Sequence, residues 1–225
     1  MSCAGAVLFF PGLLLLLLSV TGANAQVDFN GTYVPVNMTQ EEKDLFLDVH
    51  NELRAKVDPE AANMVFMKWD EPLAEMAQAW SAECVWGHGQ TEPNITPFKQ
   101  IGQNLYRISG YGNRPSGRAV SQAWYNEISW YTLETNACQE GKVCGHYTQL
   151  AWANSHFLGC AMYFCENATG DGRVQYNNVW IVTCNYGPAG NVRSLKPYKP
   201  GPNCTKCDSG VGECYNSQCR KCFSS

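Results

Sequence analysis

Twelve cysteines in 225 residues constrain this chain more than any other feature of its sequence. Cysteine at this density is typical of proteins that fold in an oxidising compartment and are held together by disulfides. Residues 1–25 carry no charged side chain, and their apolar run from Ala6 to Leu18 is shorter than the roughly 20 residues of a membrane-spanning helix. Small residues precede Gln26, as signal peptidase requires. We therefore expect a signal peptide over residues 1–25 and a secreted protein, with an uncleaved anchor as the alternative.

The charge balance argues against a nucleic-acid partner. Sixteen Lys and Arg against twenty Asp and Glu leave a net charge of −4, the wrong sign to attract a phosphate backbone. After residue 25 we expect no transmembrane segment. Five Asn-x-Ser/Thr sequons would lie on the surface of a secreted glycoprotein: Asn30, Asn37, Asn94, Asn167 and Asn203.

Apolar periodicity predicts a mixture of helices and strands. Thr39 and Glu42 form a capping box at the start of the first helix, and Pro72 suits the first turn of the second. The helices are expected over about residues 40–57, from about residue 70, and over about 116–131; the strands over 64–69, 157–165 and 179–186. Because these elements show no regular β-α-β alternation, we expect an α+β layered domain.

The composition changes after Asn191. Residues 196–202 (KPYKPGP) are typical of a stiff linker, and five cysteines lie between residues 204 and 222. This tail is too short for a core of its own, so cross-links must stabilise it. Cys204 and Cys207 form a C-x-x-C pair that also fits zinc, but behind a signal peptide we favour disulfides.

Two segments resemble signatures of one protein family. They are residues 145–155 (GHYTQLAWANS) and 181–192 (IVTCNYGPAGNV), supported by residues 50–54 (HNELR) and 84–88 (CVWGH). These segments resemble the CAP superfamily, which comprises cysteine-rich secretory proteins, antigen 5 and pathogenesis-related 1 proteins. The sequence looks closest to the branch of peptidase inhibitor 16 and the glioma pathogenesis-related proteins. The resemblance, over about residues 41–219, implies a three-layer α-β-α sandwich with a small disulfide-rich C-terminal hinge.

The residue patterns and the resemblance together give the expected organisation of the chain. We expect a signal peptide over 1–25, an N-terminal extension over 26–39, a CAP domain over 40–195, and a linker with a cysteine-rich hinge over 196–225. Carried over by position, the family's disulfides would pair Cys84 with Cys165, Cys138 with Cys144, Cys160 with Cys184, Cys204 with Cys214 and Cys207 with Cys219.

Cys222 is left over by this pairing. It is expected to be a free thiol or to join another molecule, because eleven cysteines follow residue 25. In full-length cysteine-rich secretory proteins a cysteine here begins a channel-regulating subdomain. This sequence ends three residues later, so that function loses its main support.

The resemblance implies a cleft with four polar residues. His88 and His146 match the family's metal-binding pair, and Glu127, in WYNEI, matches one of its two acidic residues. At the other acidic position, where the family usually has Gly-Glu-Asn, this chain has Gln103, in GQNLY. A catalytic zinc usually has three protein ligands, and a general base must ionise, so Gln103 suits neither role. We expect at most a weak two-histidine zinc site, no other cofactor, and no catalytic residues.

The other two histidines and one apolar stretch have plainer interpretations. His50 is expected to be a structural hydrogen-bonding residue in the first helix, and His156 a solvated loop residue. Leu105–Tyr111 is interpreted as a flexible apolar loop that could contact lipid, with packing of its tyrosines on the domain as the alternative.

We predict a secreted, non-enzymatic binding protein whose histidine-lined cleft engages an extracellular protein or a sterol or lipid. The resemblance implies a protease-inhibitor-like or defence role. The first alternative is a weak metal-dependent peptidase that uses His88, His146 and Glu127. The second is a truncated channel-regulating secretory protein. The sequence contains neither a Gly-x-Ser-x-Gly motif nor an HExxH helix that would independently support an enzyme.

Overall fold

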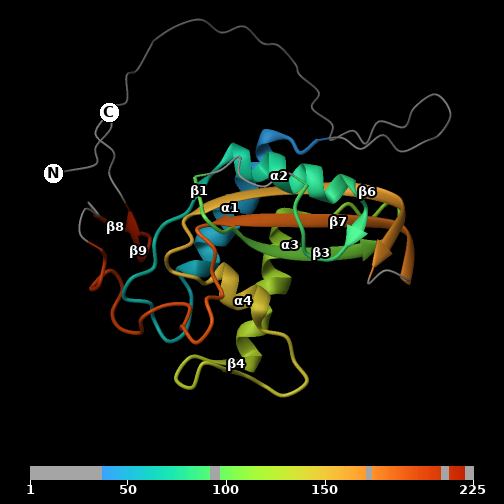
Figure 1. Ribbon diagram of the computed structural model, residues 1–225. Coiled ribbons are helices and arrows are strands. Elements are labelled where there is room, and N and C mark those ends of the chain that lie inside the picture. The colour runs from blue at the N-terminus through green and yellow to red at the C-terminus, as the bar shows by residue number, and fades with distance from the viewer. Residues whose placement is uncertain (1–36, 92–96, 171–173, 209–212, 221–225) are drawn as a thin grey trace, which may run out of the picture.

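The described part of the computed structural model comprises residues 37–91, 97–170, 174–208 and 213–220 (Figure 1). The expected signal peptide, the N-terminal extension before residue 37, the sequons at Asn30 and Asn94, and Cys222 lie outside the described residues. Of the other sequons, Asn37 and Asn167 are exposed and Asn203 is half-buried. No helix in the described ranges combines the length and apolar character needed to cross a membrane.

One sheet forms the centre of the fold. Its long hairpin comprises β6 (Phe157–Gly170) and β7 (Val174–Gly187), and β3 (Gly102–Ser109) pairs antiparallel with β7. Two short strands, β1 (Lys68–Trp69) and β2 (Val85–Trp86), pair parallel with β6. The order β1-β6-β7-β3 places β3 at one edge. Short pairs also occur elsewhere in the described chain, β4 (Tyr131–Thr132) with β5 (Ala137–Cys138) and β8 (Glu213–Tyr215) with β9 (Gln218–Arg220).

The expected flexible loop at residues 105–111 is wrong, because most of it belongs to β3. Tyr106 is half-buried against the main core. Tyr111 is 47% exposed, and its ring lies 4.9 Å from that of Phe164. The alternative interpretation, that these tyrosines pack on the domain, therefore describes the structure. Of the strand predicted over residues 64–69, only the two residues of β1 form a strand.

The helices cover both faces of this sheet (Figure 1). α2 (Glu71–Ala82) packs on one face, where Asn185 Nδ2 donates to the carbonyl of Leu73 over 3.1 Å. The other three helices are α1 (Gln40–Arg54), α3 (Gly117–Tyr125) and α4 (Gly145–Leu150). They pack on the opposite face, where their buried residues form the main core with alternate residues of β6 and β7. The arrangement confirms the predicted α-β-α sandwich.

The helix starts follow the predicted caps. Thr39 and Glu42 form the capping box of α1, and the Asp70 side chain accepts from the Leu73 N–H at the start of α2. α1 ends at Arg54, earlier than predicted, and Pro59 follows shortly after, where a helix is disfavoured. The third helix is also shorter than predicted, because residues 126–130 continue it as a 3₁₀ helix, η1 (Asn126–Trp130).

Five disulfides join all ten cysteines of the described residues. They are the five pairs that the family resemblance implied. The prediction that cross-links stabilise the tail is incomplete, however, because packing on the domain also holds it. Gln218 and Cys219 are fully buried, and Cys219 N–H donates to the carbonyl of Met64 over 2.6 Å. Tyr198, in the expected linker, is also buried in a core cluster. The C-terminal segment therefore docks on the domain as well as being cross-linked.

Candidate functional site

The four expected site residues come from four separate parts of the chain. His88 follows β2, Gln103 lies on β3, Glu127 lies in η1 and His146 is the second residue of α4. The structure pairs them: His88 contacts Gln103, and His146 contacts Glu127. They form two pairs, each of an imidazole and a side-chain acceptor.

Gln103 uses both ends of its amide. Its Oε1 accepts from Gly89 N–H over 3.2 Å, and its Nε2 donates to Gly89 O over 2.9 Å and to Asn185 Oδ1 over 3.1 Å. These partners fix the orientation of the amide, because a flipped amide would place like groups against one another. His88 Nδ1, 3.1 Å from Gln103 Oε1, must therefore carry the proton and donate. The groups around residue 103 therefore suit the glutamine of this chain, which both donates and accepts, in place of the family's usual glutamate.

Gln103→Glu tests this matching. We expect the substitution to lower the free energy of unfolding by about 1–2 kcal/mol at pH 7, because a carboxylate cannot donate to Gly89 O and Asn185 Oδ1. The pKa of the new carboxyl should be raised in the folded state, since only its protonated form can donate. The penalty should therefore shrink as the pH falls through that pKa. Urea unfolding at pH 7 and pH 5 measures both effects.

Gln175→Glu is the matched control for this experiment, because Gln175 is exposed on β7. It should change the stability by less than about 0.5 kcal/mol. Equal stability of the Gln103→Glu and Gln175→Glu variants at pH 7 would show that the amide at residue 103 is not required.

Glu127 is buried and fully engaged. Its Oε1 accepts from His146 Nδ1 over 2.6 Å, and its Oε2 accepts the backbone N–H groups of His146 and Tyr147 over 3.0 Å each. A carboxylate only accepts, so His146 Nδ1 carries a proton. Glu127 therefore positions His146 and the start of α4, which argues against the expected alternative role of a base acting on water.

The two imidazoles present the same nitrogen. With Nδ1 of each occupied as a donor, Nε2 of the neutral ring keeps its lone pair. Among the described residues, no hydrogen-bond partner contacts Nε2 of either ring. A carbonyl or carboxylate on one ring nitrogen is the usual support for a metal-ligating histidine, because it fixes the tautomer and raises the basicity of the other nitrogen. Each ring therefore has the support that is usual for a zinc-ligating histidine.

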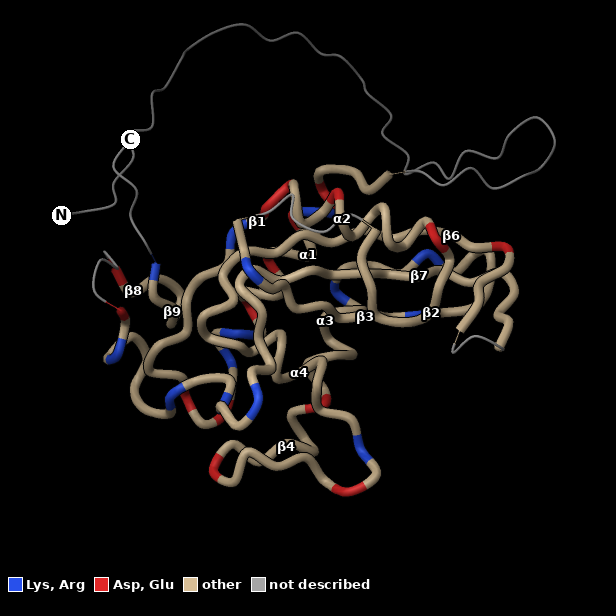
Figure 2. Tube along the Cα trace, viewed as in Figure 1, with Lys and Arg blue, Asp and Glu red and all other residues tan. Residues whose placement is uncertain are grey.

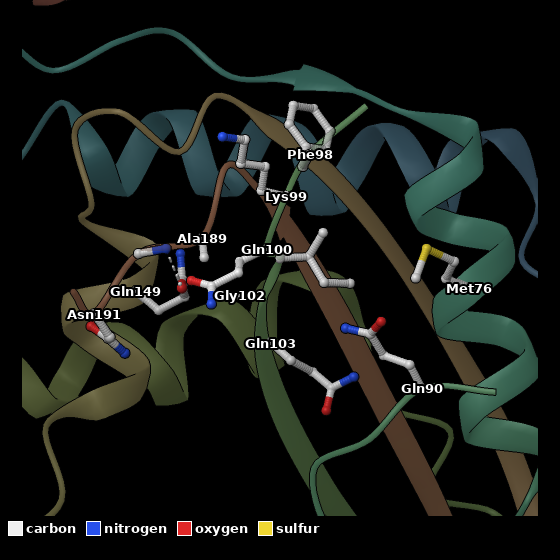
Figure 3. A pocket seen from close by; sticks show the side chains of 12 residues that line it. Met76, Gln90, Phe98, Lys99, Gln100, Gly102, Gln103, Gln149, Ala189 and Asn191 are labelled. Carbon is white, nitrogen blue, oxygen red and sulfur yellow. Dashed lines mark hydrogen bonds between the residues drawn. The ribbon is translucent and has the colours of Figure 1, made fainter. Parts of the chain in front are cut away.

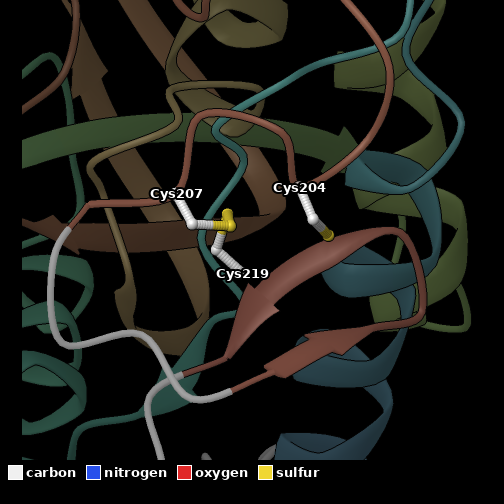
Figure 4. A group of neighbouring side chains, drawn as sticks. All are labelled: Cys204, Cys207 and Cys219. Atoms are coloured by element: carbon white, nitrogen blue, oxygen red, sulfur yellow. A yellow bond between two sulfur atoms is a disulfide. The ribbon is translucent and has the colours of Figure 1, made fainter.

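A complete catalytic zinc set is not present in the described part of the chain. There, only Cys204, Cys207 and Cys219 place three ligand atoms of His, Cys, Asp or Glu within 4.8 Å of one another (Figure 4). These sulfurs belong to two disulfides, Cys204–Cys214 and Cys207–Cys219, so they hold no metal. His88, His146 and Glu127 are not such a group among the described residues.

An amide-lined pocket of about 520 Å³ lies beside Gln103 (Figure 3). Its walls include Gln90, Gln100, Gln149 and Asn191, and its lining contains neither His88 nor His146. The expectation of a histidine-lined cleft is therefore not met by this pocket. Sequence analysis missed these amides; Gln149 and Asn191 lie within the two family segments, which was the available signal.

The other two histidines have structural contacts. His50 is fully buried; its Nδ1 lies 2.8 Å from Phe46 O and its Nε2 lies 2.9 Å from the hydroxyl of Tyr186. Burial lowers the pKa of His50 to about 4, so the ring is neutral at pH 7. Both ring nitrogens are used, and His50 is structural as predicted. His156 lies outside the helices and strands, as predicted; it is half-buried, and its Nδ1 donates to Asn154 O.

A chain of hydrogen bonds links the core to the site. Tyr186 donates to His50 Nε2 and accepts from Asn104 Nδ2 over 3.1 Å. Asn104 Nδ2 also donates to the backbone carbonyl of His146 over 2.9 Å. Sequence analysis did not single out Asn104 or Tyr186. These hydrogen bonds hold the backbone of α4 at the carbonyl of His146, whereas Glu127 holds it at the N–H of the same residue.

The fold and the site define a class of protein, a disulfide-bonded α-β-α sandwich with two supported imidazoles. A family model described as CAP, the cysteine-rich secretory protein family, matches residues 47–186. Because this match covers more than half of the sequence, the chain belongs to the CAP family.

Relatives place the chain near the branch that the sequence indicated. Human Peptidase inhibitor 16 is 38% identical over 219 residues, which are 97% of this chain and 42% of that protein. Human GLIPR1-like protein 1 is 39% identical over 178 residues, 77% of this chain and 69% of that protein. Mouse Glioma pathogenesis-related protein 1 is 40% identical over 175 residues, 77% and 62% of the two chains. The chain spans 34% to 42% of the length of the human, bovine and mouse Peptidase inhibitor 16.

Solved structures share the fold. Na-ASP-1 has a TM-score of 0.64 and 27% identity, over 81% of this chain and 47% of that chain. The structure of NaASP2 with Zn²⁺ has a TM-score of 0.59 and 28% identity, over 81% of this chain and 96% of that chain. These similarities confirm the expected CAP sandwich.

Proposed function

We propose that this protein is a secreted, non-enzymatic CAP protein that binds zinc weakly through Nε2 of His88 and His146. The observation that carries this proposal is the matched support of the two rings, from Gln103 on one and Glu127 on the other. Two imidazoles leave the remaining positions on zinc to water, so the affinity should be modest. The NaASP2 structure with Zn²⁺ lends support from a relative.

The proposed role is binding and not hydrolysis. Zinc would supply a Lewis acid, but neither of the family's two acidic positions offers a base beside it. Residue 103 is a glutamine, which does not ionise, and Glu127 already accepts three N–H donors. An extracellular binding protein is supported by the five disulfides of the described residues, by the family's description as secretory and by the relatives' names. An extracellular protein or a sterol or lipid is the proposed partner class.

Zinc titration tests the site. We expect His146→Ala and His88→Ala each to weaken zinc binding by at least tenfold, because each removes one of two protein ligands. His156→Ala is the matched control and should bind zinc like the wild type, because His156 does not contact either pair. Calorimetric titration of the folded, oxidised protein measures the affinity. Equal affinities of the His146→Ala and His156→Ala variants would refute the assignment.

The same variants distinguish the non-enzymatic proposal from the peptidase alternative. Incubation with a peptide library and zinc should give no cleavage above that of the His146→Ala protein. Zinc-dependent cleavage that disappears in this variant would establish a hydrolase and overturn the non-enzymatic proposal. The channel-regulating alternative has no support from the described residues.

A further inference from the structure

Two hollows share one wall, made by the segment that follows β7. The first, of about 420 Å³, lies between this segment and the region of β4 and β5. The second, of about 670 Å³, lies on its other side, toward Asn63 and Tyr198. Both hollows are lined by Trp152, Val192, Ser194, Leu195 and Pro197. The two hollows therefore flank the same segment, and together they are here called the 192–199 groove.

The 192–199 groove is apolar and cationic. Val192 and Leu195 are 47% and 57% exposed, and both line each of the two hollows. The lining of the first hollow includes Lys142 and Arg193, and that of the second includes Lys196 and Lys199. No Asp or Glu occurs among the described residues that line either hollow. The whole chain has a net charge of −4, so this surface has the opposite sign to the protein as a whole.

The cationic character belongs to the lining of the groove and not to the whole side of the molecule around it. Figure 2 shows basic positions with acidic positions among them on the side that carries the irregular C-terminal segments and β8 and β9. A surface of one sign attracts a partner of the other sign and orients it during the encounter. The groove is therefore suited to an anionic ligand.

The shared wall is held from both sides. Asn136 Nδ2 donates to Leu195 O over 3.2 Å, and Lys196 Nζ donates to the carbonyl of Glu134 over 2.8 Å. On the other side, Ala153 N–H donates to Pro197 O over 2.8 Å. A surface that is already ordered loses little conformational entropy when a ligand binds. The groove is thus preformed in the protein.

We propose that the 192–199 groove binds an extended acidic segment of a protein partner, with apolar residues between the acidic ones. An extended segment points alternate side chains to opposite faces, so acidic groups could face the cations while apolar groups enter the hollows. A flat lipid surface fits less well, because the exposed aliphatic side chains border concave spaces. This surface lies outside the histidine pairs and stands independently of zinc binding.

A synthetic peptide tests the proposal. The probe is a fluorescent peptide of about ten residues that alternates glutamate with leucine. We expect an affinity on the order of 10–100 µM in low salt, which weakens as salt is added. Arg193→Glu and Lys199→Glu should each weaken binding about tenfold, and Leu195→Ser severalfold. Fluorescence anisotropy with the full chain measures these changes.

Two controls accompany these variants. Lys99→Glu makes the same charge change at an exposed lysine of the amide-lined pocket and should bind the peptide like the wild type. A peptide with lysine in place of glutamate should not bind. Because the substituted groove residues are exposed, the variants should keep their stability and zinc affinity, so a failure here is distinguishable from a failure of the zinc proposal.

Three results would overturn the proposal. The first is no peptide binding by the wild type, and the second is equal binding by the groove variants and Lys99→Glu. The third is binding to vesicles of phosphatidylserine and phosphatidylcholine, lost in the groove variants, without peptide binding. That last outcome would assign the groove to an anionic membrane surface instead.

Discussion

Replacement of Arg54 by Met should lower the free energy of unfolding by about 3–5 kcal/mol, the largest effect that we expect from a single substitution. Arg54 is 1% exposed. Its Nη1 donates to the carbonyls of Leu150 and Trp152 over 2.7 and 2.8 Å, and its Nη2 donates to those of Val65 and Ala153 over 2.6 and 3.2 Å. Methionine fills a similar volume but leaves these carbonyls buried without their donor.

The guanidinium closes the C-terminal end of α4. Leu150 is the last residue of that helix, whose final carbonyls have no partner within the helix itself. Burial lowers the pKa of Arg54 to about 9, so the group is still charged at pH 7. Because His146 lies at the other end of α4, Arg54 also helps to fix the element that carries a proposed zinc ligand.

Arg118→Met is the matched control for this prediction. Arg118 forms an exposed ion pair with Glu52, with 57% of its side chain accessible, so its loss should cost less than about 1 kcal/mol. Urea unfolding with the disulfides intact measures both variants. Similar losses for Arg54→Met and Arg118→Met would contradict the role assigned to the buried guanidinium.

Removal of the Cys84–Cys165 disulfide should cost about 4 kcal/mol. The two residues are separated by 81 positions, and in the chain-entropy model a cross-link that closes a longer loop restricts the unfolded chain more strongly. Cys84 also lies directly between the end of α2 and β2, the strand that leads to His88. The double variant Cys84→Ala, Cys165→Ala should therefore lose both stability and zinc affinity.

The Cys138–Cys144 pair supplies the comparison. Its separation is 6 positions, so its replacement by two alanines should cost about 2 kcal/mol in the same model. Denaturant unfolding of both double variants gives the two costs. An equal or larger loss for Cys138 and Cys144 would show that loop length does not determine the stabilisation here.

Local signals in the sequence predicted the helix starts well. A cap depends on residues a few positions apart, so Thr39, Glu42, Asp70 and Pro72 carry enough information to locate two helices. β3 was missed because its pattern is obscured: Gln103 and Asn104 lie within the strand and take part in side-chain networks. A strand whose polar residues are satisfied by distant partners shows no clear alternation.

Contacts between distant residues explain what the sequence could not predict. Gln218 Nε2 donates to Asn51 O over 2.9 Å, which helps to dock the tail on α1, and no local pattern indicates this bond. The residues of the site were assigned through the family resemblance. Their roles follow only from the hydrogen bonds in the structure. The Gln103 amide donates to Gly89 and Asn185, and the Glu127 carboxylate accepts from backbone and imidazole N–H groups.

The most direct test of the central claim is a crystal structure of the protein soaked in zinc chloride, with anomalous data collected at the zinc edge. We predict a single peak in the site, about 2.0–2.1 Å from Nε2 of both His88 and His146, with Nδ1 still bonded to Gln103 and Glu127. A peak bound by the carboxylate of Glu127, or the absence of zinc between the two rings at saturating concentration, would contradict the account.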